Sequence, residues 1–229
     1  MKLGIMQPYF FPYIGYWQLI NLVDTFVIYD DVTFIKQGYI NRNYLLANGQ
    51  AQLMTLALNG ASSNKLINEI QVGNNPKKIL KTIIQNYSKA PYFKVVYLLI
   101  EDILMKKEKS LEKYIGYSLI MISKYLEIKT EFIYSSDIQK NEMLKAQDRV
   151  IEINKQLGAT VYINAIGGKE LYKKEDFKKE NIELKFLKME EFEYKQFNNE
   201  PIPFLSIIDI MMFNSKDEVI KMLNRYSLE

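Results

Sequence analysis

The chain has 229 residues, of which 48% are hydrophobic and 25% are charged, and its 30 basic and 27 acidic residues leave a net charge of +3, values typical of a globular protein. It contains no cysteine and no histidine, which excludes disulfides, thiolate nucleophiles, Ser-His-Asp triads and metal sites built on these ligands. Catalysis would have to use carboxylates, lysine, tyrosine, serine, backbone groups or an oxygen-ligated cation; we predict no metal site, and the sequence identifies no cofactor.

The first predicted elements form a strand–helix–strand unit. A short apolar strand at 3–6 leads into a loop at 7–12 that is rich in proline and aromatic residues, and a helix follows over 13–23. Pro12 suits the first turn of that helix, where its missing N–H costs nothing. The β-branched and aromatic residues at 25–29 then predict a second strand.

The middle of the chain changes from strands to helices. We predict a strand at 52–58 and a shorter one at 67–72, before the turn signal Asn74-Asn75-Pro76. The periodicity then predicts helices at 76–87, 92–106 and 110–126. This mainly helical segment, at about 76–127, is interpreted as an insert on the sheet.

The last part returns to alternating elements. The predicted strands are 130–134, 160–164 and 183–187, and the predicted helices are 141–157, 207–213 and 216–225. Alternation of this kind predicts one α/β domain over residues 1–229, with a mostly parallel sheet and helices on both faces. Ligands of such sheets bind beyond the carboxyl ends of the strands, a rule that selects loops 7–12, 30–31 and 164–169.

The loop after the first strand offers two interpretations. It leads into a helix N-terminus, whose free N–H groups suit an anion, so Gln7 and Tyr9 are candidate substrate-binding residues. The alternative is a rigid aromatic loop packed on the sheet.

Charged and amide side chains follow the second strand. Asp30 and Asp31 close it and are the candidate catalytic residues, although an Asx turn or a helix cap would explain them as well. Lys36, Asn41 and Arg42 come soon after and could bind a sugar or nucleotide. An ion pair of Arg42 with Asp30 or Asp31 is the structural alternative.

Two further segments carry candidate substrate-binding residues. Asn164, Gly167, Gly168 and Lys169 follow a predicted strand, where paired glycines permit close backbone approach to a ligand, although a simple turn has the same residues and the P-loop spacing is absent. Asp209 stands alone in an apolar run, so it must have a partner or border a polar cavity.

Charge distribution and hydrophobicity limit the partners and the location. The basic residues are scattered and do not form a block that could follow a phosphate backbone, so we do not expect nucleic acid as the main partner. The first apolar run is too short for a signal peptide, and no stretch approaches the roughly 20 apolar residues of a spanning helix. We therefore expect a cytoplasmic protein without a membrane span. The sequence leaves its oligomeric state open.

Segments 6–43, 81–93, 162–172 and 203–214, taken in order, resemble the WbqC-like protein family across nearly the whole chain. The first of them, MQPYFFPYIGYWQLINLVDTFVIYDDVTFIKQGYINRN, is long and specific. The resemblance implies a role in the biosynthesis of O-antigen or a related surface polysaccharide. It also implies transfer of glycine or another aminoacyl group to an amino sugar.

A more distant analogy concerns residues 12–20, which are similar in placement to the His-x-Gly-His element of nucleotidyltransferase-like, Rossmann-like α/β enzymes. Tyr13 and Tyr16 occupy the two histidine positions. If the analogy holds, it raises ATP-dependent acyl activation, but the residues that normally steady the triphosphate are missing.

Together these features predict an acyl or aminoacyl transferase, with glycyl transfer as one form, that acts on a nucleotide-linked amino sugar. Asp30 or Asp31 would remove a proton from the attacking amine, while Arg42 and Lys169 would hold phosphate or oxyanion charge. The acyl donor is not identified. The alternative hypothesis is a non-catalytic sugar-binding or assembly protein of the same pathway, because the sequence identifies no nucleophile paired with a base.

Overall fold

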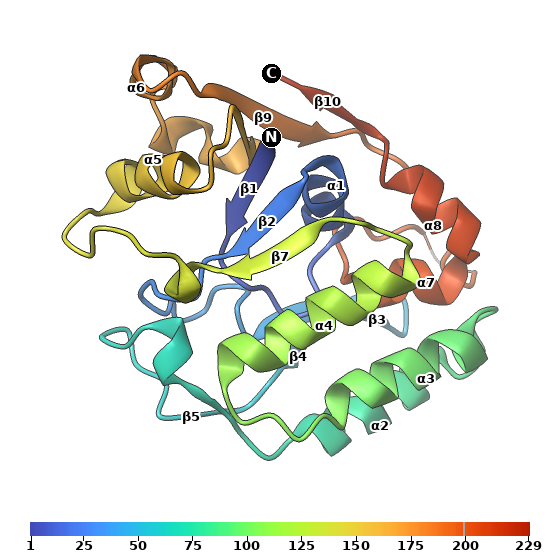
Figure 1. The fold of residues 1–229 in the computed structure, drawn as a ribbon. Helices are drawn as coiled ribbons and strands as arrows, with labels where there is room; N and C mark the ends of the chain where they lie inside the picture. Colours follow the sequence, from blue (N-terminus) through green and yellow to red (C-terminus); the bar gives the residue numbers. More distant parts are fainter. Residues whose placement is uncertain (199) are drawn as a thin grey trace.

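A sheet with a mostly parallel arrangement forms the centre of the computed structural model, which describes residues 1–198 and 200–229. Within these residues the sheet has six strands in the order β10-β9-β8-β1-β2-β7 (Figure 1). They are β1 (Lys2–Met6), β2 (Thr25–Ile28), β7 (Glu131–Tyr134), β8 (Val161–Ala165), β9 (Glu183–Met189) and β10 (Tyr226–Leu228). β10 is antiparallel to β9, and the other neighbouring strands are parallel. The predicted α/β fold with a mostly parallel sheet is confirmed.

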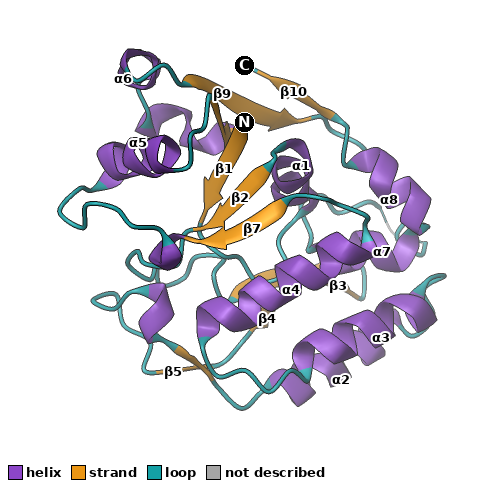
Figure 2. Cartoon of the chain, in the orientation of Figure 1, coloured by secondary structure: helices purple, strands orange, loops and turns teal. Residues whose placement is uncertain are grey.

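Helices cover both faces of this sheet because its strands are apolar on both sides. Successive residues of a strand point to opposite faces, and Phe26 and Ile28 pack into one hydrophobic core while Val27 packs into the other. The first core contains residues of α1 (Ile14–Leu22) and α4 (Leu111–Tyr125), and the second contains residues of α5 (Ala146–Gln156) and α6 (Lys174–Lys179). Figure 2 shows these helices around the strands.

The strand order reverses between β1 and β8. From β1 the chain adds β2 and then β7 on one side, and it returns to the other side of β1 with β8 and then β9. Ligands of open α/β sheets bind at such a point, beyond the carboxyl ends of the two strands concerned. Here those ends are Met6 of β1 and Ala165 of β8.

The connection from β2 to β7 contains two small hairpins and a group of helices. Its elements are β3 (Arg42–Ala47), β4 (Gln50–Thr55), β5 (Leu58–Asn59), β6 (Gln71–Val72), α2 (Pro76–Tyr87), α3 (Phe93–Leu104) and α4. The predicted strand at 52–58 is therefore wrong in its second half. The first hairpin turns at Asn48 and Gly49, which both have positive φ angles (49° and 73°), as a tight two-residue turn requires.

The structure corrects two helix boundaries near the end of the chain. The predicted helix at 141–157 begins only at Ala146, because the Asn141 side chain accepts a hydrogen bond from the Met143 N–H and holds a turn there. The C-terminal helices are α7 (Ile207–Phe213), as predicted, and α8 (Lys216–Met222), which stops early because the chain turns into β10. Among the described helices, none combines the length and the apolar character needed to cross a bilayer.

Candidate functional site

A cavity of about 340 Å³ opens where the strand order reverses. We call it the tyrosine cavity; its lining consists of Met6, Tyr9, Pro12, Tyr13, Tyr16, Leu19, Tyr39, Asn43, Ala165 and Phe204. Met6 and Ala165 are the last residues of β1 and β8, so the cavity occupies the position that the topology selects. None of these lining residues carries a charge.

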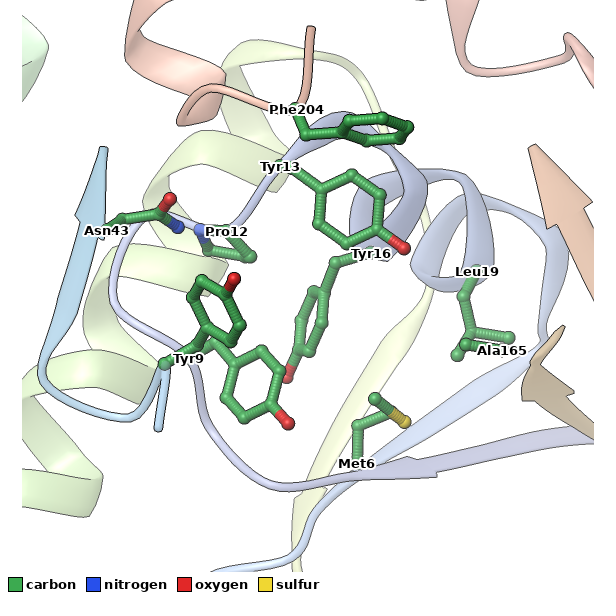
Figure 3. A pocket seen from close by; sticks show the side chains of 10 residues that line it. Met6, Tyr9, Pro12, Tyr13, Tyr16, Leu19, Asn43, Ala165 and Phe204 are labelled. Carbon is green, nitrogen blue, oxygen red and sulfur yellow. The ribbon is translucent and has the colours of Figure 1, made fainter. Parts of the chain in front are cut away.

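Aromatic rings from three parts of the chain form the wall of the tyrosine cavity. Tyr9 follows β1, with its ring centroid 5.4 Å from that of Tyr16 on α1 and 5.9 Å from that of Tyr39. Tyr13 precedes α1 and meets Phe204 edge to face at 6.1 Å. Figure 3 shows Phe204 over Tyr13 and the rings of Tyr9, Tyr13 and Tyr16 around one space. The wall therefore offers several ring faces to a ligand.

The loop that carries Tyr9 is fixed from two sides. Phe10 and Phe11 of the same loop are fully buried. Asn43 Nδ2 donates hydrogen bonds to their backbone carbonyls at 3.3 and 2.9 Å. Ser206 Oγ donates to the Phe11 carbonyl as well, at 2.8 Å. Phe11 has a φ of 44°, which is unusual for a bulky residue and is characteristic of functional sites held by surrounding contacts. The loop thus combines aromatic packing with a cavity wall.

Most hydroxyls of the tyrosine cavity are available to a ligand. Tyr16 donates its O–H to the Gln7 carbonyl at 2.8 Å, whereas no described residue makes a hydrogen bond with the hydroxyl of Tyr9, Tyr13 or Tyr39. Burial raises the pKa of Tyr9, Tyr13 and Tyr16 above the usual value near 10. These phenols therefore stay protonated at neutral pH, where they can donate and accept hydrogen bonds but cannot serve as phenolate bases.

Gln7 and Tyr9 were both predicted to bind substrate, but they differ in their position relative to the tyrosine cavity. Tyr9 lines the tyrosine cavity, whereas Gln7 is outside its lining and contributes its backbone carbonyl to Tyr16. The loop after β1 is thus close to the cavity mainly through its aromatic residues.

Asp30 and Asp31, the predicted catalytic residues, are buried at the end of β2 and do not line the tyrosine cavity. Asp30 accepts hydrogen bonds from the backbone N–H and the hydroxyl of Ser136, at 3.0 and 2.6 Å. Asp31 Oδ2 lies 2.7 Å from both Lys140 Nζ and Arg149 Nη2, and the Lys140 side chain is fully buried. The two carboxylates connect β2 with the segment that follows β7.

Arg42 and Asn41 support the turn that carries Tyr39. Arg42 Nε donates to the Gly38 carbonyl at 3.1 Å, and its Nη2 donates to the Gln37 carbonyl. Asn41 Nδ2 donates to a backbone carbonyl after β4 at 2.9 Å. The structural alternative, an ion pair of Arg42 with Asp30 or Asp31, is wrong, because those acids have the partners given above.

The loop after β8 is folded around Asn164. The Asn164 Nδ2 donates to Tyr162 OH at 2.8 Å, and the Asn164 Oδ1 accepts from the Ala165 N–H at 2.7 Å. Gly168 lies so close that an added Cβ would be 3.2 Å from the Asn164 amide, whereas Gly167 faces open space. Gly168 thus permits packing of the loop, and of this segment it is Ala165 that lines the tyrosine cavity.

The two predicted lysines are on the surface. Lys36 is exposed, and Lys169 Nζ lies 2.6 Å from Glu229 Oε2, with its side chain 56% exposed. An exposed ion pair of this kind contributes little stability. Neither lysine lines the tyrosine cavity.

Asp209 is fully buried and has hydrogen-bond partners instead of a polar cavity. Its carboxylate accepts from Tyr87 OH at 2.7 Å, Tyr194 OH at 2.6 Å and Gln196 Nε2 at 2.8 Å. Burial raises the pKa of Asp209, and the three hydrogen bonds oppose that shift. The network ties residues 194–196 to α7.

Several residues of the tyrosine cavity were not predicted. Tyr13 and Tyr16 stand three positions apart at the start of α1, directly beyond a strand end, and this spacing was the available signal. Tyr39, Asn43 and Phe204 arrive from distant segments, so no local pattern marks them. In the described part of the chain, no group of three or more acidic side chains is arranged to hold a metal ion.

Comparison with known proteins gives a family and one distant relative. Residues 7–221 match the family model described as the WbqC-like protein family. An uncharacterized protein of Mycobacterium tuberculosis, Rv1507c, is 25% identical over 215 residues, which cover 92% of each chain. No solved structure matches.

Proposed function

This chain belongs to the WbqC-like protein family, and from that premise we propose that it binds a nucleotide-linked amino sugar of surface-polysaccharide biosynthesis, such as O-antigen, and transfers an acyl or aminoacyl group to the sugar's amine. The observation that carries the proposal is the uncharged, tyrosine-lined cavity at the reversal of strand order. The proposed pathway rests on what the family resemblance implies, and the cavity supports the proposed site.

The chemistry of the tyrosine cavity suits a ring with hydroxyl or amide groups. Its volume is at the lower end of the range for small-molecule sites, roughly 300–1,000 Å³, so it fits one ring system better than a whole nucleotide sugar. Tyrosine faces stack on a sugar or a base, and the hydroxyls of Tyr9 and Tyr13, to which no described residue forms a hydrogen bond, can bond its polar groups. Because the lining is uncharged, we expect the phosphates to lie outside the cavity.

The order of the parallel strands supports the Rossmann-like analogy. Numbered in chain order, β7, β2, β1, β8 and β9 give the arrangement 3-2-1-4-5, which is the order of doubly wound nucleotide-binding folds. In this interpretation the segment with α2, α3 and α4 is a helical insert between β2 and β7. Fold alone does not imply function. The analogy therefore supports a nucleotide ligand only, and the proposed reaction rests on what the family resemblance implies.

The proposed reaction is acyl transfer from an activated acyl ester to the amino sugar. The amine nitrogen attacks the ester carbonyl carbon, the new C–N bond forms, and the bond to the alcohol or thiol leaving group breaks. The leaving group takes up the proton that the nitrogen loses. A protonated tyrosine such as Tyr13 would donate a hydrogen bond to the oxyanion that develops on the carbonyl oxygen.

A second candidate function is a sugar-binding or assembly protein of the same pathway that performs no chemistry. The observation that favours it is the absence of any carboxylate or amine from the described lining of the tyrosine cavity, which leaves no general base in contact with a ligand there.

A panel of nucleotide sugars, with and without amino groups, tests the proposal. At a concentration of about 100 times its dissociation constant, a true ligand should add roughly 2.7 kcal/mol to the free energy of unfolding, which thermal melting detects. The binders are then incubated with protein and activated acyl esters, and mass spectrometry looks for the added acyl mass. Acylated product supports the transferase, binding without product supports the second candidate, and no thermal shift with any nucleotide sugar contradicts both.

A further inference from the structure

We propose that the outward surface of α2, α3 and the loop after α3 docks on a membrane that contains anionic lipids. We call this surface, formed by the exposed residues of segment 76–109, the lysine face. Figure 1 shows α2 and α3 at one margin of the molecule, with α4 between them and the sheet. No residue of this segment lines the tyrosine cavity, so the inference is independent of the proposed function.

The lysine face concentrates the positive charge of the protein. Segment 76–109 has eight lysines and three acidic residues, a net charge of +5, whereas the whole chain has +3 and the rest of the chain therefore −2. All eight lysines are exposed, and none forms an ion pair with a described residue. They are Lys77, Lys78, Lys81, Lys89, Lys94, Lys106, Lys107 and Lys109.

The fold gathers lysines that are far apart in the sequence. Only a short loop joins α2 (Pro76–Tyr87) to α3 (Phe93–Leu104), and helices joined in this way run antiparallel. The start of α2 with Lys77 and Lys78 therefore lies beside the end of α3, where Lys106 and Lys107 follow. The basic residues read as scattered along the chain because this grouping exists only in the folded protein.

An apolar stripe accompanies the lysines on α3. The helix buries the side that contains Val96 and Ile100. On the opposite side Val95 is 57% exposed, Leu98 64% and Met105 41%, and their spacing places them on one face. Helices that lie in a membrane interface combine such apolar side chains with lysines, whose charged ends stay among the lipid headgroups.

Neighbouring groups engage the three acidic residues of the segment. Glu101 accepts a hydrogen bond from Tyr97 OH and Asp102 accepts one from Tyr117 OH of α4, both at 2.7 Å. Glu108 accepts from the backbone N–H groups of the two residues that follow it, at 2.8 and 2.9 Å. These bonds hold the carboxylates on the protein, while the lysines are left to face an anionic surface.

The form of the lysine face favours lipid over another macromolecule. Val95 and Leu98 project from the outer side of a helix, and a fluid interface adapts to such side chains, whereas a protein partner would need pockets that match them. Nucleic acid is bound largely by aromatic stacking and arginine, but the most exposed apolar side chains here are aliphatic and the basic residues are lysines. Lysine clusters beside an amphipathic helix are typical of sites for anionic lipids.

Co-sedimentation with vesicles tests the inference. We expect binding to phosphatidylcholine vesicles that contain about one-third phosphatidylglycerol, and none to phosphatidylcholine alone. Raising the salt from about 0.1 M to about 1 M should release most of the protein, because the Debye length falls from about 10 Å to about 3 Å.

Two matched quadruple variants separate the lysine face from net charge. Replacing Lys77, Lys78, Lys106 and Lys107 by Gln should weaken partitioning about a hundredfold or more, since one lysine near such a surface contributes about fivefold. The control removes four exposed lysines elsewhere and should have a much smaller effect; these are Lys173, Lys174, Lys178 and Lys179. Thermal melting verifies that both variants fold.

A fluorescent probe tests contact of the apolar stripe with lipid. The chain has no cysteine, so one introduced cysteine can carry a polarity-sensitive dye. With anionic vesicles, the dye at Leu98→Cys should shift its emission to shorter wavelengths, as in an apolar environment. The control at Leu171→Cys, where the native side chain is 71% exposed, should not shift.

Three results would overturn the inference: no sedimentation with anionic vesicles, equal losses in the two quadruple variants, or an unchanged dye at Leu98→Cys. Binding of poly-L-glutamate that depends on the same lysines, without vesicle binding, would assign the lysine face to an acidic protein instead. Vesicle binding that the lysine-face variant loses and the control keeps, together with the dye shift, supports docking on a membrane.

Discussion

Replacing Asp31 by Asn is expected to lower the free energy of unfolding by about 3–5 kcal/mol, the usual effect of removing one partner from a buried ion pair. Asp31 Oδ2 lies 2.7 Å from both Lys140 Nζ and Arg149 Nη2, and the Lys140 side chain is fully buried. The substitution keeps the shape but leaves the buried Lys140 without a counter-charge and Arg149 with only the exposed Glu142. Urea unfolding measures the loss.

A matched control uses the other acidic partner of Arg149. Glu142 lies 3.4 Å from Arg149 and is 73% exposed, so Glu142→Gln should change stability by less than about 0.5 kcal/mol. If Asp31→Asn does not fold, the double variant with Lys140→Met should recover part of the stability because it removes the unpaired buried charge. An Asp31→Asn protein that is fully stable but inactive would contradict the structural role and favour Asp31 as the catalytic base.

Replacing Gly15 by Ala is expected to weaken nucleotide-sugar binding about tenfold to a hundredfold, or roughly 1.4–2.7 kcal/mol, without lowering stability. A Cβ at Gly15 would lie 2.4 Å from Cε2 and 2.8 Å from the hydroxyl oxygen of Tyr13. The ring of Tyr13 would have to move, and with it one wall of the tyrosine cavity. Alanine favours a helix by about 0.5–1 kcal/mol relative to glycine, which offsets the cost of the displacement.

The control is the same substitution at Gly116 in α4. There an added Cβ would meet the hydroxyl of Tyr134, which is outside the tyrosine cavity, so Gly116→Ala should leave nucleotide-sugar affinity unchanged. In a Tyr13→Ala background, Gly15→Ala should cause no further loss if it acts through the tyrosine ring. Calorimetric titration of the four variants with the best nucleotide sugar decides this. A large loss of affinity on adding Gly15→Ala to the Tyr13→Ala variant would contradict an effect that acts through the Tyr13 ring.

The parallel sheet could be predicted because its strands follow short-range rules. The strands that end at Met6 and Ile28 read as apolar, β-branched runs, and their order in the chain with helices between them implies parallel pairing. The hairpin of β3 and β4 was also within reach, since Asn48-Gly49 is a strong two-residue turn signal. Only a strand at 52–58 was predicted, which overlaps β4 and misses β3.

The location of the candidate site could be predicted, but of its lining residues only Tyr9 was. The carboxyl-edge rule selected the loops that begin at Gln7 and Asn164, and the tyrosine cavity lies between the ends of the strands before them. The charged candidates were chosen for their chemistry. Asp31 instead has Lys140 and Arg149 as partners, from more than 100 positions further along the chain, and no local pattern reveals such a pairing.

Long-range placement also explains why Phe204 escaped prediction. It stands in a loop before α7 and reaches the first helix only through the folded structure, where it meets Tyr13. Asp209 nearby was correctly expected to need a partner or a cavity, because an isolated buried carboxylate is costly. The choice between a partner and a cavity depended on Tyr87 and Tyr194, which only the folded chain brings close to Asp209. The assignment of residues 1–229 to a single domain stays a prediction.

The most direct test of the central claim is a crystal structure of the protein with the nucleotide sugar that binds best in the panel. We predict electron density for a sugar or base ring in the tyrosine cavity, stacked on Tyr9, Tyr13 or Tyr16, with the phosphates outside the cavity toward solvent. Density for the ligand at Asp30 and Asp31, or at any place that leaves the tyrosine cavity empty, would contradict it.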